Sequence, residues 1–138
     1  GEVTHIHPDI INTLTRQGFI PVIAPVGTGE AGETFNINAD LVASRIAMAL
    51  KAGRLILLTD VDGVLDAAGT LISSIDAYGI QSMIDNGSIS GGMIPKIKCA
   101  LEALHSGVEK VPIINGTRRH ALLLELFTDS GIGTEVTL

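Results

Sequence analysis

The six-residue run Arg54–Thr59 (RLILLT) constrains the fold of this chain more than any other segment. Its four central residues are aliphatic, and the acidic, glycine-containing stretch DVDGVLDAAGT follows it directly. A strand without polar alternation is buried on both faces, which is typical of the centre of a parallel sheet. Helices must then cover both faces of that sheet. The run therefore predicts an α/β fold, specifically a three-layer α/β/α sandwich with a mainly parallel central sheet.

Helical and extended segments alternate along the rest of the chain. Periodicity and punctuation by glycine predict helices at 8–17, 39–52, about 76–85, from Pro95 to Gly107, and about 119–127. Extended segments are expected at 19–26 (FIPVIAPV, as a short buried strand), 33–37, 54–59, near 71–72, at 110–114 and at the C-terminus. No linker or repeat interrupts this pattern, so residues 1–138 are expected to form a single domain.

Composition excludes several classes of protein. The formal charge is −6, and the nine basic residues are scattered rather than gathered in a stripe, so neither nucleic acid nor an anionic membrane is an expected partner. A single cysteine, Cys99, excludes an internal disulfide and fits a reducing, cytoplasmic setting. No apolar run approaches the ~18 residues of a membrane span, so we expect a soluble protein. The chain begins with Gly1 in sequence typical of mid-domain, which suggests a fragment.

Neither the glycine-rich stretch nor the histidines give a strong signal for a binding site. Gly27, Gly29 and Gly32 match G-x-G-x-x-G after a predicted strand, but an extended segment follows instead of the helix that a dinucleotide site requires. A hairpin loop is the preferred interpretation. The four histidines show no metal-ligand spacing, so no protein-bound metal is predicted.

The stretch DVDGV supports an alternative function. A strand followed by Asp60 and Asp62 resembles the opening motif of haloacid-dehalogenase phosphatases, in which the first Asp is a nucleophile and the second a general acid. Such magnesium enzymes also need a lysine, for which Lys96 is available, and a further acidic pair at a later strand end. That position holds Asn115 here. Asp and Gly also commonly form tight turns after strands.

Two helix starts carry polar residues suited to anions. Lys96 lies in the first turn of a helix preceded by a glycine pair, where unpaired N–H groups and the helix dipole favour phosphate; a solvated lysine, beside an ordinary Lys98–Glu102 pair, is the alternative. In FNINAD, Asn38 is a natural N-cap and Asp40 a natural first-turn acid. Asn36 lies two residues earlier on an extended segment, on the same face as Asn38.

Four stretches together resemble one family. NINAD, LILLTDVDGVL, GGMIPKI and HALLLELFTDSGIGT resemble, in this order, the C-terminal half of the amino-acid kinase family, over essentially the whole chain. The tail is similar to that of members acting on N-acetyl-L-glutamate. The resemblance implies phosphorylation of the γ-carboxylate of that substrate by ATP, with substrate-bound Mg²⁺, in arginine biosynthesis. It also implies a missing N-terminal half, a homo-oligomeric parent protein and a fragment that is inactive alone.

The resemblance assigns roles to individual residues. Lys96 matches a lysine that stabilises the transferring phosphoryl group, Asp40 an acid that positions lysines around it, and Asn36 and Asn38 substrate-binding residues. The implied ATP-binding residues are Asp60, Val61, Asp62, Gly63, Val64, Leu65, Ser88, Ile89, Ser90 and Gly92. Glu125 and Gly131 match contacts to an arginine effector, although Pro112 stands where arginine-inhibited members have a histidine, and Ala67 near where they have a basic residue. A non-catalytic small-molecule-binding domain is a further alternative.

Overall fold

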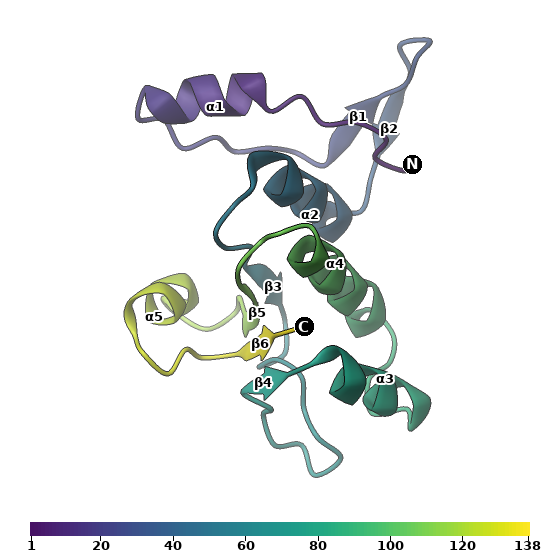
Figure 1. Cartoon of the computed structure of the whole chain (residues 1–138), viewed down its shortest axis with the longest axis vertical. Coiled ribbons are helices and arrows are strands. Elements are labelled where there is room, and N and C mark those ends of the chain that lie inside the picture. Colours follow the sequence, from purple (N-terminus) through teal and green to yellow (C-terminus); the bar gives the residue numbers. More distant parts are fainter.

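In a computed structural model that describes residues 1–138, a four-stranded sheet forms the centre of the molecule (Figure 1). Its strand order is β3-β5-β6-β4. The strands are β3 Leu57–Thr59, β4 Ser74–Ile75, β5 Val111–Asn115 and β6 Thr134–Val136. The pairs β3–β5 and β4–β6 are parallel and β5–β6 is antiparallel. The mainly parallel sheet is thus confirmed, and all five residues of β5 are buried. The central position predicted for 54–59 is wrong: β3 is an edge strand, and Leu58 is 52% exposed because no strand or helix of this chain covers that side.

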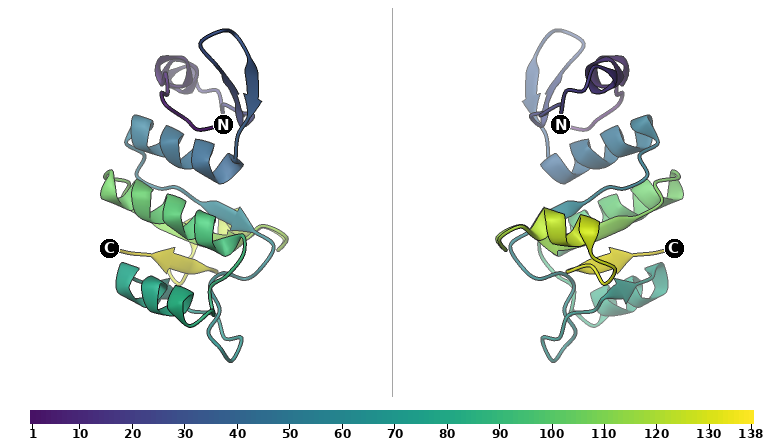
Figure 2. Two further views of the ribbon diagram at one scale, coloured as in Figure 1. Left: turned by 90° about the vertical axis from the view of Figure 1, so that its right-hand side faces the viewer. Right: turned by 90° about the vertical axis from the view of Figure 1, so that its left-hand side faces the viewer.

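Helices cover both faces of this sheet. The two side views in Figure 2 show α3 (Ala77–Asp85) and α4 (Met93–His105) on one face and α5 (Ala121–Phe127) on the other. Helix α2 (Ala39–Leu50) packs alongside α4. The most buried side chains between these layers are Ile97, Ala100, Ala103, Val111 and Ile113. The predicted three-layer arrangement is therefore confirmed.

The first 38 residues lie outside the central sheet. They contain α1 (Asp9–Arg16) and a two-stranded antiparallel hairpin formed by β1 (Val26–Thr28) and β2 (Thr34–Asn36). The glycine-rich segment between those strands is a hairpin loop, closed by a hydrogen bond from the Gly29 N–H to the Glu33 carbonyl. This confirms the preferred interpretation of the G-x-G-x-x-G match.

The predicted buried strand at 19–26 is wrong. Only Val26 belongs to a strand, and residues 19–25 run as an irregular, largely exposed segment in which Ile20 and Val22 are 89% and 96% exposed. No other strand of this chain pairs with the segment, and Pro21 and Pro25 have no N–H to donate to one. An apolar run becomes a buried strand only where a neighbouring strand and a covering layer exist.

Several element ends differ from the predictions by a few residues. Helix α2 ends at Leu50 rather than at Ala52, because Lys51 itself adopts the left-handed backbone (φ 50°) that usually selects glycine. Helix α4 begins at Met93 rather than at Pro95, which still lies in the first turn, where a missing N–H costs nothing. The strand expected near 71–72 is displaced to β4, and Leu71 forms only an isolated bridge with Leu65.

None of the five helices has the length and apolarity that crossing a bilayer requires.

Candidate functional site

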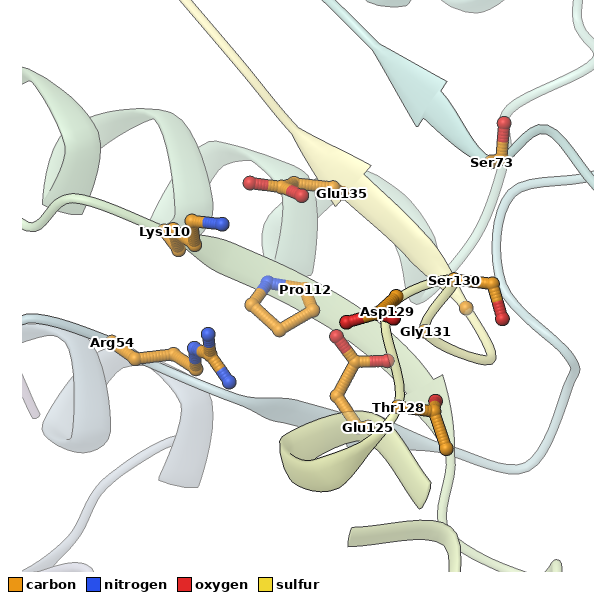
Figure 3. Close-up of a pocket in the computed structure, with 11 residues that line it drawn as sticks. Arg54, Ser73, Lys110, Pro112, Glu125, Thr128, Asp129, Ser130, Gly131 and Glu135 are labelled. Atoms are coloured by element: carbon orange, nitrogen blue, oxygen red, sulfur yellow. The ribbon is translucent and has the colours of Figure 1, made fainter. Parts of the chain in front are cut away.

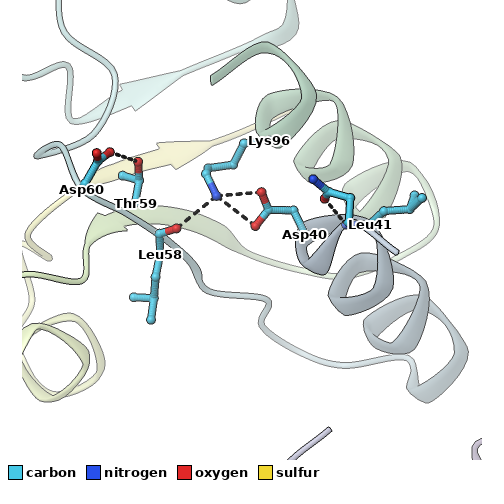
Figure 4. A network of polar contacts seen from close by, with 7 residues as sticks. Asp40, Leu41, Leu58, Thr59, Asp60 and Lys96 are labelled. Atoms are coloured by element: carbon cyan, nitrogen blue, oxygen red, sulfur yellow. Dashed lines mark hydrogen bonds and ion pairs between the residues drawn. The ribbon is translucent and has the colours of Figure 1, made fainter. Parts of the chain in front are cut away.

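An ion pair joins the first turns of two helices (Figure 4). The Nζ atom of Lys96, on α4, donates to both carboxylate oxygens of Asp40, on α2, at 2.9 and 2.8 Å. Its third hydrogen bond goes to the carbonyl of Leu58, on β3, at 3.0 Å. The two ionic side chains are 11% and 26% exposed. All three N–H groups of the ammonium are thus used, in a site that is only partly open to water.

The local sequence explains how Asp40 is available for this pair. Asn38 is the N-cap of α2, and its side-chain oxygen accepts the Leu41 N–H at 3.1 Å. Asp40 is therefore not needed as a cap, although a carboxylate in a first turn still interacts favourably with the helix dipole. The carboxylate also offsets the unfavourable position of a lysine at the start of α4. Asn38 thus caps α2, as predicted, while Asp40 pairs with Lys96.

A cavity is formed by the two loops, around 60–65 and 88–92, that the family resemblance links to ATP. It has a volume of about 170 Å³ and lies beside the start of α4. Its lining residues are Val61, Gly63, Val64, Leu65, Ser88, Ile89, Ser90 and Met93. The structure thus brings together two stretches that are separated in the sequence by β4 and α3. Met93 also lines the cavity, although the family resemblance did not include it among the ATP-binding residues.

Three residues of the expected ATP-binding set do not line that cavity. Asp60 accepts a hydrogen bond from the Thr59 hydroxyl at 3.3 Å, and Gly92 is the residue that precedes α4. Asp62 accepts from the side-chain amide of Asn115, at the end of β5, at 2.9 Å. From the sequence alone, Asn115 stands only where a phosphatase would need an acidic metal ligand. The structure shows that it ties the acidic loop to the sheet.

The acidic loop does not gather the carboxylates of a magnesium phosphatase. No group of three His, Cys, Asp or Glu side chains in the chain is placed to hold a metal ion. Asn115, whose side-chain oxygen also accepts the N–H and hydroxyl of Thr117, occupies the position where an acidic pair was required. The donor set around Asp60 and Asp62 therefore does not match the haloacid-dehalogenase alternative.

A polar cavity of about 100 Å³ lies against β5 and β6, beside the end of α5 (Figure 3). Its lining residues are Arg54, Ser73, Lys110, Pro112, Glu125, Thr128, Asp129, Ser130, Gly131, Gly133 and Glu135. Glu125 accepts the Ile132 N–H at 2.9 Å, and Gly131 has a left-handed backbone (φ 61°) against that carboxylate. Both expected effector contacts, and Pro112, thus lie in one cavity of mixed charge. Ala67 does not line it.

Asn36 and Cys99 line neither of these two cavities. Asn36 ends β2, is exposed, and makes no side-chain hydrogen bond within the chain, so the structure does not connect it to the ion pair. Cys99 is a buried thiol on α4. Burial, followed by the negative charges of Asp40 and Glu102, raises the pKa of Cys99 above its ordinary value of 9.0. The thiol therefore stays neutral near pH 7 and fills space on the buried side of α4.

Known proteins resemble the chain over its whole length. An acetylglutamate kinase from Oleidesulfovibrio alaskensis is 58% identical over 99% of the chain, which covers 46% of that relative. Among solved structures, the smu.665 protein of Streptococcus mutans is 36% identical with a TM-score of 0.83, over 99% of this chain and 50% of that one. An N-acetylglutamate synthase from Neisseria gonorrhoeae, in complex with coenzyme A and N-acetyl-glutamate, is 33% identical with a TM-score of 0.87, over 94% and 30%.

The chain spans about half the length of the curated relatives it matches. The sequence pattern that defines the Amino acid kinase family matches residues 1–115, from the N-terminal segment through the end of β5. This match includes the ion pair, the cavity between the two loops and most of the sheet. It also includes the DVDGV stretch on which the haloacid-dehalogenase alternative was based. The chain belongs to the amino acid kinase family.

Proposed function

We propose that this chain is the nucleotide-binding half of an acetylglutamate kinase, which uses ATP to phosphorylate the γ-carboxylate of N-acetyl-L-glutamate in arginine biosynthesis. The Lys96–Asp40 pair carries the proposal, because it places a cation at the starts of two helices beside a cavity formed by the expected nucleotide loops. Identities of 54–58% to relatives named acetylglutamate kinase support the choice of substrate within the family.

The proposed reaction needs positioning and positive charge rather than a covalent nucleophile on the protein. A γ-carboxylate oxygen of the substrate forms a bond to the γ-phosphorus of ATP, and the bond from that phosphorus to the bridging oxygen of ADP breaks. Lys96 stabilises negative charge on the transferring group, and Asp40 holds the ammonium in place. Mg²⁺, bound with ATP, neutralises charge on the phosphates.

The other proposed contacts follow the geometry of the site. The nucleotide occupies the cavity lined by the two loops. Asn36 binds the α-carboxylate of the substrate, since its side-chain amide has no partner within the chain. Asn38 binds the substrate through its side-chain NH2 group, because only its side-chain oxygen is used in capping α2.

The rest of the site is proposed to come from the other half of the protein. In the family resemblance that half supplies a second lysine, a glycine-rich phosphate loop and an arginine for the substrate. An apolar surface is available for its docking. It comprises the exposed side chains of Phe19, Ile20 and Val22 and a cavity of about 340 Å³ between residues 21–25 and α2. The chain alone is therefore expected to be inactive. The family resemblance also implies that the parent protein is a homo-oligomer.

The direct test is ADP release by the protein that carries both halves. We expect release to depend on N-acetyl-L-glutamate and to be far slower with L-glutamate, which lacks the acetyl group. ADP release that is independent of the acceptor would contradict the proposal. Phosphate release from a generic ester that disappears in Asp60→Asn would favour a phosphatase instead. Silence in calorimetry with millimolar ATP and magnesium would favour a non-catalytic binding domain.

We also propose that the polar cavity binds an arginine effector. Its mixed charge suits a zwitterion with a cationic side chain, because Glu125, Asp129 and Glu135 can face guanidinium and amino groups while Arg54 and Lys110 face a carboxylate. Arginine is expected to inhibit the whole protein, and Glu125→Gln to weaken that inhibition about tenfold or more. Inhibition unchanged in Glu125→Gln would remove this cavity from regulation.

A further inference from the structure

A buried hydroxyl closes a ring of hydrogen bonds behind the loop at 60–65. Thr134, on β6, is fully buried, and its Oγ1 atom accepts the Val64 N–H at 2.8 Å. The same hydroxyl donates to the Ile72 carbonyl at 2.6 Å. The Ile72 N–H in turn donates to the Val64 carbonyl at 2.9 Å. Thr134 thus fixes two residues of one loop region, Val64 and Ile72, that lie 70 and 62 positions before it in the chain.

The ring fixes a wall of the cavity between the two loops. Val64, whose N–H and carbonyl are both bonded within the ring, lines that cavity together with Gly63 and Leu65. Gly63 lies directly against the hydroxyl: a Cβ atom at that position would be 2.6 Å from Thr134 Oγ1. The loop therefore has contact with Thr134 on its inner side and with the cavity on its outer side.

We propose that Thr134 is a positioning residue for nucleotide binding, because its hydroxyl holds the Val64 backbone and hence the cavity wall in place. The proposal depends on the function proposed above, in which this cavity takes ATP. Thr134 reaches the ligand only through the loop. No side chain other than the hydroxyl of Thr134 hydrogen-bonds to the backbone of Val64.

The two hydrogen bonds of the Thr134 hydroxyl predict that the position of Val64 depends more on this hydroxyl than on the volume of the side chain. Thr134→Val keeps nearly the same shape, but leaves the Val64 N–H and the Ile72 carbonyl without partners in a buried place. Such groups are costly, so the loop must move to find new partners. Thr134→Ser removes a methyl group but keeps both hydrogen bonds. Comparing the two variants therefore separates positioning from packing.

Amide hydrogen exchange in the protein that carries both halves tests the ring directly. We expect the Val64 amide to exchange about tenfold faster or more in Thr134→Val and close to the wild-type rate in Thr134→Ser. The Ile97 amide, on a fully buried helix residue, serves as the internal control for global opening. Equal exchange at Val64 in all three proteins would overturn the proposal, as would equal acceleration in both variants.

Steady-state kinetics on the same proteins test the consequence for the nucleotide. We expect the KM for ATP to rise about tenfold in Thr134→Val and to stay within about twofold in Thr134→Ser. The KM for N-acetyl-L-glutamate should change little, because the ring does not reach that part of the site. An unchanged KM for ATP in Thr134→Val would refute the positioning role. A wild-type protein without acceptor-dependent turnover would instead refute the proposed function, and Val64 exchange would still decide whether Thr134 holds the loop.

Discussion

Lys96 and Asp40 are 56 residues apart in the chain, yet Nζ of the first lies 2.8 Å from a carboxylate oxygen of the second. They meet because α2 and α4 pack side by side with their first turns together, next to the carboxyl end of β3. Leu58 at that strand end accepts the remaining hydrogen bond of the lysine. In open α/β sheets, ligands bind at the carboxyl ends of strands, which is where this pair lies.

Removing the ammonium should abolish most of the turnover. In the protein that carries both halves, Lys96→Ala is expected to lower kcat about 10²- to 10³-fold, because charge that develops on the phosphoryl group loses its stabilising cation. Lys98→Ala is the matched control: it removes an exposed lysine from the same helix and should leave kcat within about twofold. Equal kcat values in the two variants would remove Lys96 from the chemistry.

The ion pair should also contribute to stability as a unit. Asp40→Asn and Lys96→Met are each expected to lower the free energy of unfolding by about 1–3 kcal/mol, since each leaves a partly buried partner without its counter-charge. The double variant should lose less than the sum of the two, by about 1 kcal/mol or more. Urea denaturation of the four proteins completes the cycle. Strictly additive losses would mean that the two groups do not stabilise each other.

Two glycines with left-handed backbones should respond differently to the same substitution. Gly63→Ala should lower the free energy of unfolding by about 3 kcal/mol, because the added Cβ meets Thr134 Oγ1 as well as an unfavourable φ of 144°. Gly69→Ala, at φ 79° with no atom near the added Cβ, should lose about 1 kcal/mol from the backbone alone. Urea denaturation compares them. Losses of the same size would show that the contact with Thr134 relaxes freely.

Cys99 should make the stability of the protein sensitive to alkaline pH. Its pKa is raised in the folded state by burial and by the charges of Asp40 and Glu102, whereas the unfolded chain titrates near 9.0. The folded state therefore binds more protons above that pH. Stability from this group is complete below about pH 9.0 and is lost as pH rises toward the folded-state pKa, by at most about 1.4 kcal/mol per pH unit.

Cys99→Ser removes this titration and keeps a side chain of similar size. Between pH 8 and pH 10 the wild type is expected to lose more of its free energy of unfolding than the variant does, as measured by urea denaturation at each pH. Other groups that titrate in this range are common to both proteins. Parallel pH profiles would show that the thiol ionises equally easily in the folded and unfolded chains.

Sequence patterns predicted the elements whose burial is complete within this chain. The aliphatic run at 110–114 became β5, whose residues are all buried because helices of the same chain cover both of its faces. The run at 54–59 became the edge strand β3, in which Leu58 is 52% exposed. Asn38 became the N-cap of α2, since capping is decided by neighbouring residues. The segment 19–26 failed because the same apolar pattern had no strand beside it, and pattern alone does not show whether a partner is present.

The site was predicted in part, for a similar reason. Residue type and family resemblance pointed to Lys96 and Asp40, but their contact depends on how two helices pack, which local sequence does not encode. The same holds for Thr134 and Asn115, whose hydrogen bonds to Val64 and Asp62 span 70 and 53 residues. A buried Thr or Asn at a strand end gives only a weak signal, because the polar partner that explains it lies elsewhere in the chain.

The three hydrogen bonds of the Lys96 ammonium set a threshold for any anion that enters the site. An incoming anion gains a hydrogen bond to Nζ only by displacing Asp40 or the carbonyl of Leu58. A singly charged anion such as chloride therefore gains little binding free energy, because its attraction to the ammonium is offset by the contact that is lost. A multiply charged phosphate can compete for the position. The lysine is thereby kept selective through the contacts it already makes, before any substrate arrives.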